Sequence, residues 1–232
     1  MKWENWVGLL GLALISVGHY QGLFVAPPEA MMGDVGRILY AHVPTAWVAL
    51  VVYLVAFVAA VGSLGSGKRG WDALVESAVE VGVVLNLLLL FQGAVWAKPT
   101  WGVFWTWDPR LTTTAIMAVS FIGVLVLRAM LNRPAQRAVA SAVYTIFAFV
   151  SVPVVYFSVK WWKTLHQPFS SPETVDSPMV TPLRVAAFGM LFLATFLIAR
   201  RWRLAYAKLS REDEAPDLPP AAAAIRLEGG GA

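Results

Sequence analysis

Apolar residues occur in six long runs, separated by short segments that are polar or rich in Gly and Pro. The runs cover residues 6–25, 41–63, 73–97, 111–131, 138–159 and 183–199. Each is close to the ~20 residues that an α-helix needs to cross a bilayer. Unpaired backbone groups are costly in lipid, so each run must be helical. The pattern predicts an all-α integral membrane protein with six transmembrane helices.

The composition agrees with this prediction. Hydrophobic residues make up 58% of the 232-residue chain and charged residues 14%, whereas soluble domains hold about 45–50% and about 25%. The chain has no Cys, which excludes disulfides, thiol catalysis and Cys-ligated metal centres. The net charge of +4 is spread over many short loops, so it indicates no nucleic-acid partner.

The domain organisation predicted is a six-helix transmembrane domain over residues 1–205 and a disordered tail over 206–232. The tail mixes charges with Pro219, Pro220 and a glycine run at 229–231, a composition that buries too little apolar surface to fold. Pro27 and Pro28 after the first run are poor context for signal cleavage, so we expect an uncleaved first helix.

The distribution of Lys and Arg predicts the orientation. With the N-terminus inside, twelve of the 18 Lys and Arg residues lie in inside segments and six in outside segments. Positive residues are enriched on the cytoplasmic side. Both termini are therefore expected in the cytoplasm, with three loops facing outward. The second of these loops, between the third and fourth helices, is rich in Trp.

All three histidines fall toward the outward side in this topology. His19 lies late in the first helix, where packing or hydrogen bonding is its expected role, whereas His42 begins the second helix and His166 follows the fifth. Most of the eleven Trp residues gather on the same side, including Trp96, Trp101, Trp105 and Trp107. An aromatic belt at the membrane interface is the plain alternative, but it does not explain the density within 101–107.

The segment 101–110 combines aromatic surface with a helix start. Asp108 before Pro109 is typical of an N-cap followed by the first helical residue. Gly102 permits close approach of another group to the backbone. Trp105 and Trp107 alternate, so in an extended segment they would face the same way. The resulting flat aromatic surface suits a large planar ligand at the membrane edge.

His42 and His166 suggest how such a ligand is held. A single His at an interface is more often a satisfied polar residue, but two beside an aromatic surface favour ligation. Neutral imidazole is an axial ligand of haem iron, and two would complete six-coordination. Arg37 and Arg110 lie on the same side and suit the haem carboxylates, although either is equally consistent with a plain loop charge.

Polar residues in the helices predict further contacts. Glu76 and Glu80 share a face of the third helix, where we expect Glu76 to pair with Lys68 or Arg69 and Glu80 to make a buried contact, for instance with a partner subunit. We also expect Asn86 to form a hydrogen bond between helices. Pro153 is expected to kink the fifth helix.

The sequence Trp-Gly-Val-Phe-Trp-Thr-Trp-Asp at 101–108 resembles the tryptophan-rich WWD signature of haem-handling membrane proteins. The segments 40–47 and 161–167 resemble those around the two haem-ligand histidines of the haem exporter protein C (CcmC) family. The small size and six spans favour CcmC over its larger relatives CcmF and CcsA. The resemblance implies His42 and His166 as axial ligands, Arg37 and Arg110 as propionate partners, and a platform made of Trp96, Trp101, Gly102, Trp105, Trp107 and Asp108.

The resemblance also implies a function and partners. Such a protein binds haem b as cargo at the outer, periplasmic face of the bacterial inner membrane. It presents the haem to the chaperone CcmE during cytochrome c maturation, within a complex of CcmA, CcmB and CcmD, and is not an enzyme. Two alternatives remain: a permease subunit that moves haem across the bilayer, and an electron-transfer subunit carrying b-type haem.

Overall fold

The computed structural model describes residues 2–166, 175 and 177–214, and all regular structure within them is helical. Two short segments, the π-helical turn η1 (Gln21–Val25) and the 3-10 turn η2 (Asp34–Ile38), lie between the first two long helices. The long helices are α1 (Trp3–Tyr20), α2 (Leu39–Ser66), α3 (Arg69–Trp101), α4 (Pro109–Met130), α5 (Pro134–Phe149), α6 (Ser151–Trp161) and α7 (Ser177–Glu214).

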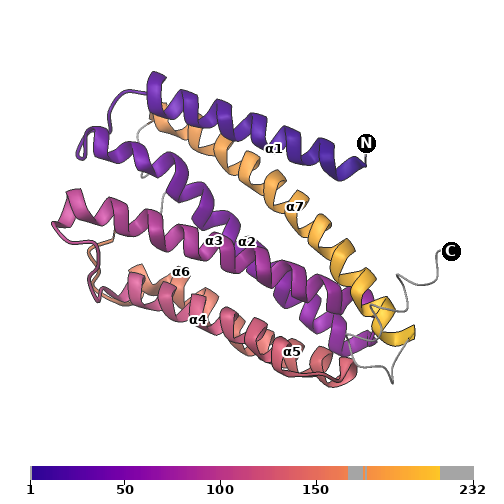
Figure 1. Ribbon diagram of the computed structural model, residues 1–232. Coiled ribbons are helices and arrows are strands. Elements are labelled where there is room, and N and C mark those ends of the chain that lie inside the picture. The colour runs from indigo at the N-terminus through magenta and orange to yellow at the C-terminus, as the bar shows by residue number, and fades with distance from the viewer. Residues whose placement is uncertain (1, 167–174, 176, 215–232) are drawn as a thin grey trace.

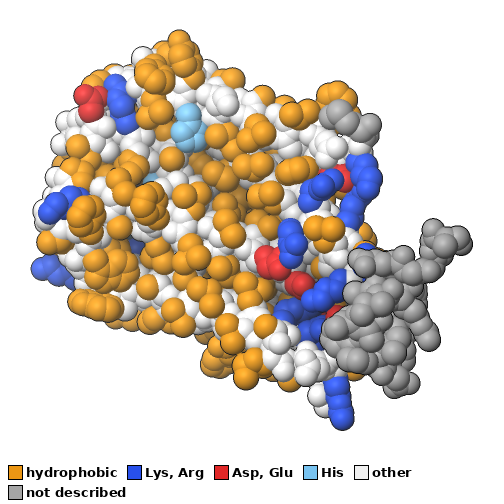
Figure 2. Space-filling view, in the orientation of Figure 1, with side chains coloured by type: hydrophobic (Ala, Val, Ile, Leu, Met, Phe, Trp, Pro, Cys, Tyr) orange, Lys and Arg blue, Asp and Glu red, His pale blue; other side chains and the backbone are white. Residues whose placement is uncertain are grey.

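These helices form six segments that are long and apolar enough to cross a membrane, as the sequence predicted. The segments are Trp3–Val25, Asp34–Ser66, Arg69–Trp101, Pro109–Met130, Pro134–Trp161 and Ser177–Glu212. They run side by side in one elongated bundle (Figure 1). The face shown in Figure 2 is largely apolar across its middle, and charged side chains gather toward its ends.

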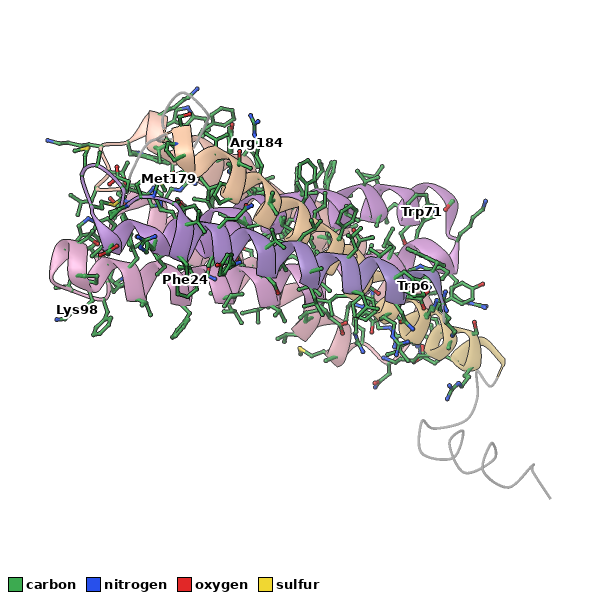
Figure 3. All side chains as sticks on the ribbon, turned by 90° about the horizontal axis from the view of Figure 1, so that it is seen from above. Trp6, Phe24, Trp71, Lys98, Met179 and Arg184 are labelled. Carbon is green, nitrogen blue, oxygen red and sulfur yellow. The ribbon has the colours of Figure 1, made fainter. Side chains whose placement is uncertain are left out.

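The bundle has two distinct ends. The start of α1 and the end of α7 lie at one end (Figure 1), which we call the terminal end, together with the turns between α2 and α3 and between α4 and α5. The connections after the first, third and fifth membrane segments, as far as the structure describes them, lie at the opposite end, which we call the loop end. Figure 3 places Lys98 at the loop end, and Trp6 and Trp71 at the terminal end. Because the chain runs along the bundle six times, residues 26–38, 102–108 and 162–166 all lie at the loop end.

Helix α1 packs closely against α7, far away in the sequence (Figure 1). Small residues allow this approach: a β-carbon on Gly11 would lie 2.7 Å from the backbone nitrogen of Leu193, and one on Gly18 would lie 2.7 Å from that of Ala186. Such glycine contacts are typical of helix pairs in membranes, where backbones gain close van der Waals contact.

Helices α2, α3 and α4 share the apolar core. Tyr53 of α2 stacks on Phe121 of α4 with ring centroids 3.7 Å apart. Asn86 of α3 is fully buried and donates a hydrogen bond from Nδ2 to the Tyr53 hydroxyl at 3.3 Å. This bond confirms the predicted role of Asn86 between helices.

The fifth membrane segment is interrupted as Pro153 predicted. It consists of α5 and α6, which meet at Val150. Proline has no backbone N–H, so Pro153 cannot complete the helical hydrogen bond to the carbonyl of Phe149, four residues earlier. The break therefore falls where that bond is lost.

Buried charges join the helices near the terminal end, with partners that differ from those predicted. Arg128 of α4 is only 6% exposed, and it contacts Asp72 and Glu76 of α3 at 2.6 Å each and Ser141 of α5 at 2.7 Å. The expected pairing of Glu76 with Lys68 or Arg69 is wrong, because Glu76 faces the neighbouring helix and not the α2–α3 turn. Glu80 pairs with Arg201 of α7 in the same chain.

Helix α7 extends beyond the predicted domain boundary at residue 205 and ends at Glu214. Ala205 and Leu209 are buried against Ala73 of α3, and this packing supports the extra turns. The first part of the predicted tail is therefore helical. Residues 215–232 lie outside the described residues, so their disorder stays a prediction.

We predict that Arg128→Met destabilises the protein by roughly 3–5 kcal/mol, because it removes the cation that contacts the buried carboxylate of Asp72 and the largely buried one of Glu76. Unfolding of the purified protein in mixed micelles with increasing dodecyl sulfate measures the change. Arg133→Met is the matched control, since Arg133 is exposed. Neutralising Asp72 and Glu76 together with Arg128 should recover most of the loss. Equal stability of Arg128→Met and Arg133→Met would contradict this role.

Candidate functional site

A cavity at the loop end collects side chains from distant parts of the chain. We call it the histidine cavity, because His42 of α2 and His166, beyond α6, both line it. The other aromatic and charged residues of its wall are Trp47, Trp96, Trp101, Trp105, Tyr156 and Arg110. The apolar remainder comes from α2, α3, α4 and α6. Four helices and two connections therefore meet at one site.

The two imidazoles face each other across a short gap. Their ring centroids are 6.4 Å apart, and the ring planes are inclined by 35°. A metal–imidazole bond is about 2.0–2.1 Å long for zinc, so a separation of this size leaves room for one metal atom between two ring nitrogens. The structure thus brings together the two histidines that the sequence singled out.

Two tryptophans of α3 build one wall of the cavity. Trp96 is 7% exposed and lies edge-on to Trp101, with ring centroids 5.2 Å apart. Trp96 also lies 6.2 Å from the His166 ring, again between centroids. Both tryptophans therefore belong to the helix and not to the loop.

The other two tryptophans of the predicted platform have different environments. Trp105 lines the cavity, and its ring is 5.8 Å from that of Trp107 in an edge-on arrangement. Trp107 is 83% exposed and is not part of the cavity wall. The two rings are neighbours, but only one of them reaches the site.

Helix α3 continues past Pro99, where the sequence suggested a break, and ends at Trp101. Gly102 follows with φ of +80°, and its N–H donates to the carbonyl of Lys98 at 3.0 Å. This left-handed conformation explains the glycine. No described residue other than its chain neighbours lies within 4 Å of where its β-carbon would stand, so the place of Gly102 in the platform stays a prediction.

Asp108 joins the start of α4 to the segment that carries His166. Its carboxylate accepts the backbone N–H of Arg110 at 2.9 Å, which confirms the predicted N-cap. The same carboxylate accepts the hydroxyl of Thr164 at 2.7 Å and the N–H of Leu165 at 2.7 Å. Asp108 is therefore both a cap and an anchor for a second segment.

Hydrogen bonds control the charge of this anchor. Burial alone would raise the pKa of Asp108, but the bonds from the Thr164 hydroxyl and the backbone amides of Leu165 and Arg110 outweigh it and hold the pKa below its usual value of 3.8. The carboxylate is thus ionised at neutral pH. Bonds to an ionised acceptor are the stronger ones, which suits an anchor.

Thr164 is the site residue that sequence reasoning missed. Its hydroxyl donates to Asp108 and accepts the backbone N–H of His166 at 3.0 Å. A Thr two residues before a candidate ligand is a local signal for such a turn. The contact with Asp108, however, spans 56 residues and no local pattern shows it.

The two arginines predicted as carboxylate partners differ. Arg110 lines the cavity, and its guanidinium donates to the carbonyls of Val155 at 3.1 Å and Tyr156 at 3.4 Å. Arg37 contacts Asp34 and the carbonyls of Gly22 and Ala26, at 2.8, 2.9 and 3.1 Å. Arg37 therefore ties the end of the first membrane segment to η2, away from the cavity wall.

Several buried polar atoms around the cavity lack a partner within the part of the chain that the structure describes. They include His42 Nδ1 and the indole nitrogens of Trp96 and Trp105. Buried polar groups are usually hydrogen-bonded, so these atoms indicate room for a ligand with polar groups. His19, by contrast, is satisfied, because its Nδ1 donates to the Ile15 carbonyl at 2.8 Å.

The size of the cavity limits how a ligand is held. Its volume is about 100 Å³, whereas pockets that enclose drug-sized ligands measure roughly 300–1,000 Å³. A large planar ligand would therefore project from the cavity or displace part of its wall.

The family model and three of the relatives that match this chain share one name. The family model "Heme exporter protein C" (CcmC) matches residues 1–216. Heme exporter protein C of Bradyrhizobium diazoefficiens is 33% identical over 202 residues, covering 84% of this chain and 76% of the relative. The Haemophilus influenzae protein of the same name is 35% identical over 209 residues (88% and 83%), and that of Escherichia coli K12 is 31% identical over 199 residues (85% and 81%).

Proposed function

Because the chain belongs to the heme exporter protein C (CcmC) family, we propose that it binds haem as cargo in the histidine cavity and delivers it for cytochrome c maturation. The single observation that carries the proposal is the pair of imidazoles 6.4 Å apart in a cavity walled by tryptophans. Haem iron accepts two histidines as axial ligands, and indole rings offer flat apolar surface to the macrocycle.

The cavity volume favours presentation over enclosure. About 100 Å³ does not hold a whole macrocycle, so the haem is held by its iron and by part of its ring, with an edge outside. Trp107, exposed beside Trp105, lies where it can contact such an edge. A cargo held in this way remains accessible to an acceptor protein.

Arg110 is the preferred partner for a haem propionate. It lines the cavity, and no described carboxylate lies within ion-pair distance of its guanidinium. Its two carbonyl contacts use only part of its five donors. Arg37, also predicted for this role, is occupied elsewhere by Asp34, Gly22 and Ala26.

The membrane orientation and the partners complete the proposal. We place the loop end at the periplasmic face of the bacterial inner membrane, since the terminal end holds most of the Lys and Arg. The acceptor proposed is the chaperone CcmE, and the complex proposed includes CcmA, CcmB and CcmD. The bound haem is haem b, and the protein itself performs no covalent chemistry.

Replacing either histidine tests the site. We expect the purified ferric wild-type complex to be six-coordinate and low-spin, and His42→Ala and His166→Ala each to become five-coordinate and high-spin. Absorption and electron paramagnetic resonance spectra measure the change. His19→Ala is the control, because His19 is bonded within α1. If both cavity variants kept the wild-type spectrum, the two-histidine site would be wrong.

Replacing the arginines tests the propionate contact. We expect Arg110→Gln to weaken haem binding about tenfold, because a bond between charged groups is worth roughly 1.5–3 kcal/mol. Absorption titration gives the dissociation constant, and haem dimethyl ester should bind wild type and Arg110→Gln alike. Arg37→Gln should retain the wild-type preference for haem over its ester. A preference that survives Arg110→Gln would contradict the assignment.

Single cysteines test the orientation without background, because the chain has none. Met31 is 93% exposed at the loop end, and Lys68 is exposed at the terminal end. We expect Met31→Cys to react with a membrane-impermeant maleimide in intact spheroplasts, and Lys68→Cys to react only after permeabilisation. The reverse pattern would overturn the orientation.

A further inference from the structure

The two histidines of the cavity are held in different ways. His42 belongs to the first turn of α2, a helix of 28 residues. Its neighbours in that turn are packed, since Val43 and Pro44 are buried. His166 lies outside regular structure, five residues beyond the last residue of α6. The backbone of one histidine is thus fixed by a long helix, and that of the other is not.

Side-chain hydrogen bonds replace the helix around His166. Asp108 accepts the Thr164 hydroxyl with both oxygens, at 2.7 and 2.8 Å, and accepts the Leu165 N–H at 2.7 Å. Thr164 in turn accepts the His166 N–H at 3.0 Å. We call this set of bonds the Asp108 clasp. It reaches the backbone of His166 itself, through one hydroxyl group.

The carboxylate at the centre of the clasp is itself fixed. Asp108 is 6% exposed and caps α4 through the N–H of Arg110. Arg110 in turn contacts the carbonyls of Val155 and Tyr156 in α6. The clasp therefore holds residues 164–166 in a fixed position relative to α4 and α6, two helices that also line the cavity.

A haem whose iron is bound to both histidines cannot leave the cavity until one of the two ligands moves away from the iron. Most of the lining comes from the packed helices α2, α3, α4 and α6. The non-helical lining residues are Trp105 and His166, and the described side-chain bonds of residues 164–166 converge on one carboxylate. Breaking a few hydrogen bonds costs less than unpacking a helix from the core.

We propose that Asp108 and Thr164 are positioning residues for His166, and that His166 is the axial ligand that is released when haem leaves the cavity. The proposal rests on haem binding between His42 and His166 as proposed above. His42 remains bound to the iron during release, because its backbone does not depend on the clasp.

A matched pair of substitutions at Thr164 tests this assignment. Thr164→Val removes the hydroxyl at nearly constant shape, whereas Thr164→Ser keeps it. The haem-loaded, full-length protein is used, and two quantities are measured: the spin state of the ferric haem, and the rate of haem transfer to apomyoglobin. A parallel measurement of amide hydrogen exchange at residues 165 and 166 in the haem-free protein reports on the clasp alone.

The expected results separate positioning from general stability. Thr164→Val should gain a five-coordinate, high-spin fraction and release haem roughly tenfold faster, as expected for a lost hydrogen bond to a charged acceptor. Added imidazole should restore the low-spin spectrum. Thr164→Ser should stay within about twofold of wild type, and Asp108→Asn should resemble Thr164→Val.

Double variants identify which histidine is affected. In the Thr164→Val background, His166→Ala should add a smaller loss than it causes in the wild type, because both changes act on the same ligand. His42→Ala should add a large loss, because it removes the remaining ligand. Equal additional losses from both histidines would overturn the assignment of the released ligand.

The outcomes distinguish this inference from the proposed function. If wild type were six-coordinate and His166→Ala five-coordinate, while Thr164→Val and Asp108→Asn kept the wild-type spectrum and release rate, the clasp would be wrong and the haem site would stand. If His166→Ala itself left the spectrum unchanged, the two-histidine site would fail first. Unchanged exchange at residues 165 and 166 in Thr164→Val would also contradict the clasp.

Discussion

The carboxylate of Asp108 is the contact on which the loop end depends. It caps α4 through the N–H of Arg110 at 2.9 Å, and it holds residues 164 and 165 by hydrogen bonds of 2.7–2.8 Å. Without it, the start of α4 and the segment of His166 have no described side-chain bond in common. The helices on either side are packed in the bundle. This one carboxylate therefore joins the connection before α4 to the connection after α6. The position of His166 relative to His42 depends on this contact.

Charges at the terminal end have the complementary role. Arg128 joins α3, α4 and α5, and Glu80 joins α3 to α7 through Arg201. Such pairs hold the helices in register near the interface, while the middle of the bundle packs through rings and small residues. A buried cation at one end and a buried anion at the other therefore fix the ends of helix α4. Its start then stands at a constant position beside the histidine cavity.

The sequence predicted the helices well, because membrane spans have a strong signal in length and apolarity. The same patterns identified His42, His166 and the Asp108 cap, each of which depends on local spacing. They did not show the contact of Asp108 with Thr164, the partner of Glu76, or the difference between Arg37 and Arg110. Those features depend on which faces of the helices pack against each other. A side-chain contact between residues 50 or more positions apart has no local signature in the sequence. Trp107 illustrates the same limit, since its exposure depends on the path of the loop.

The proposed function requires that two histidine nitrogens of this chain bind one haem iron at the loop end. Pulsed electron paramagnetic resonance of the ferric complex tests it most directly, with ¹⁵N-histidine in the protein and haem of natural isotopic abundance. We expect hyperfine coupling from two iron-bound ¹⁵N nuclei in the wild-type complex. Coupling from one nucleus, or from none, would contradict it.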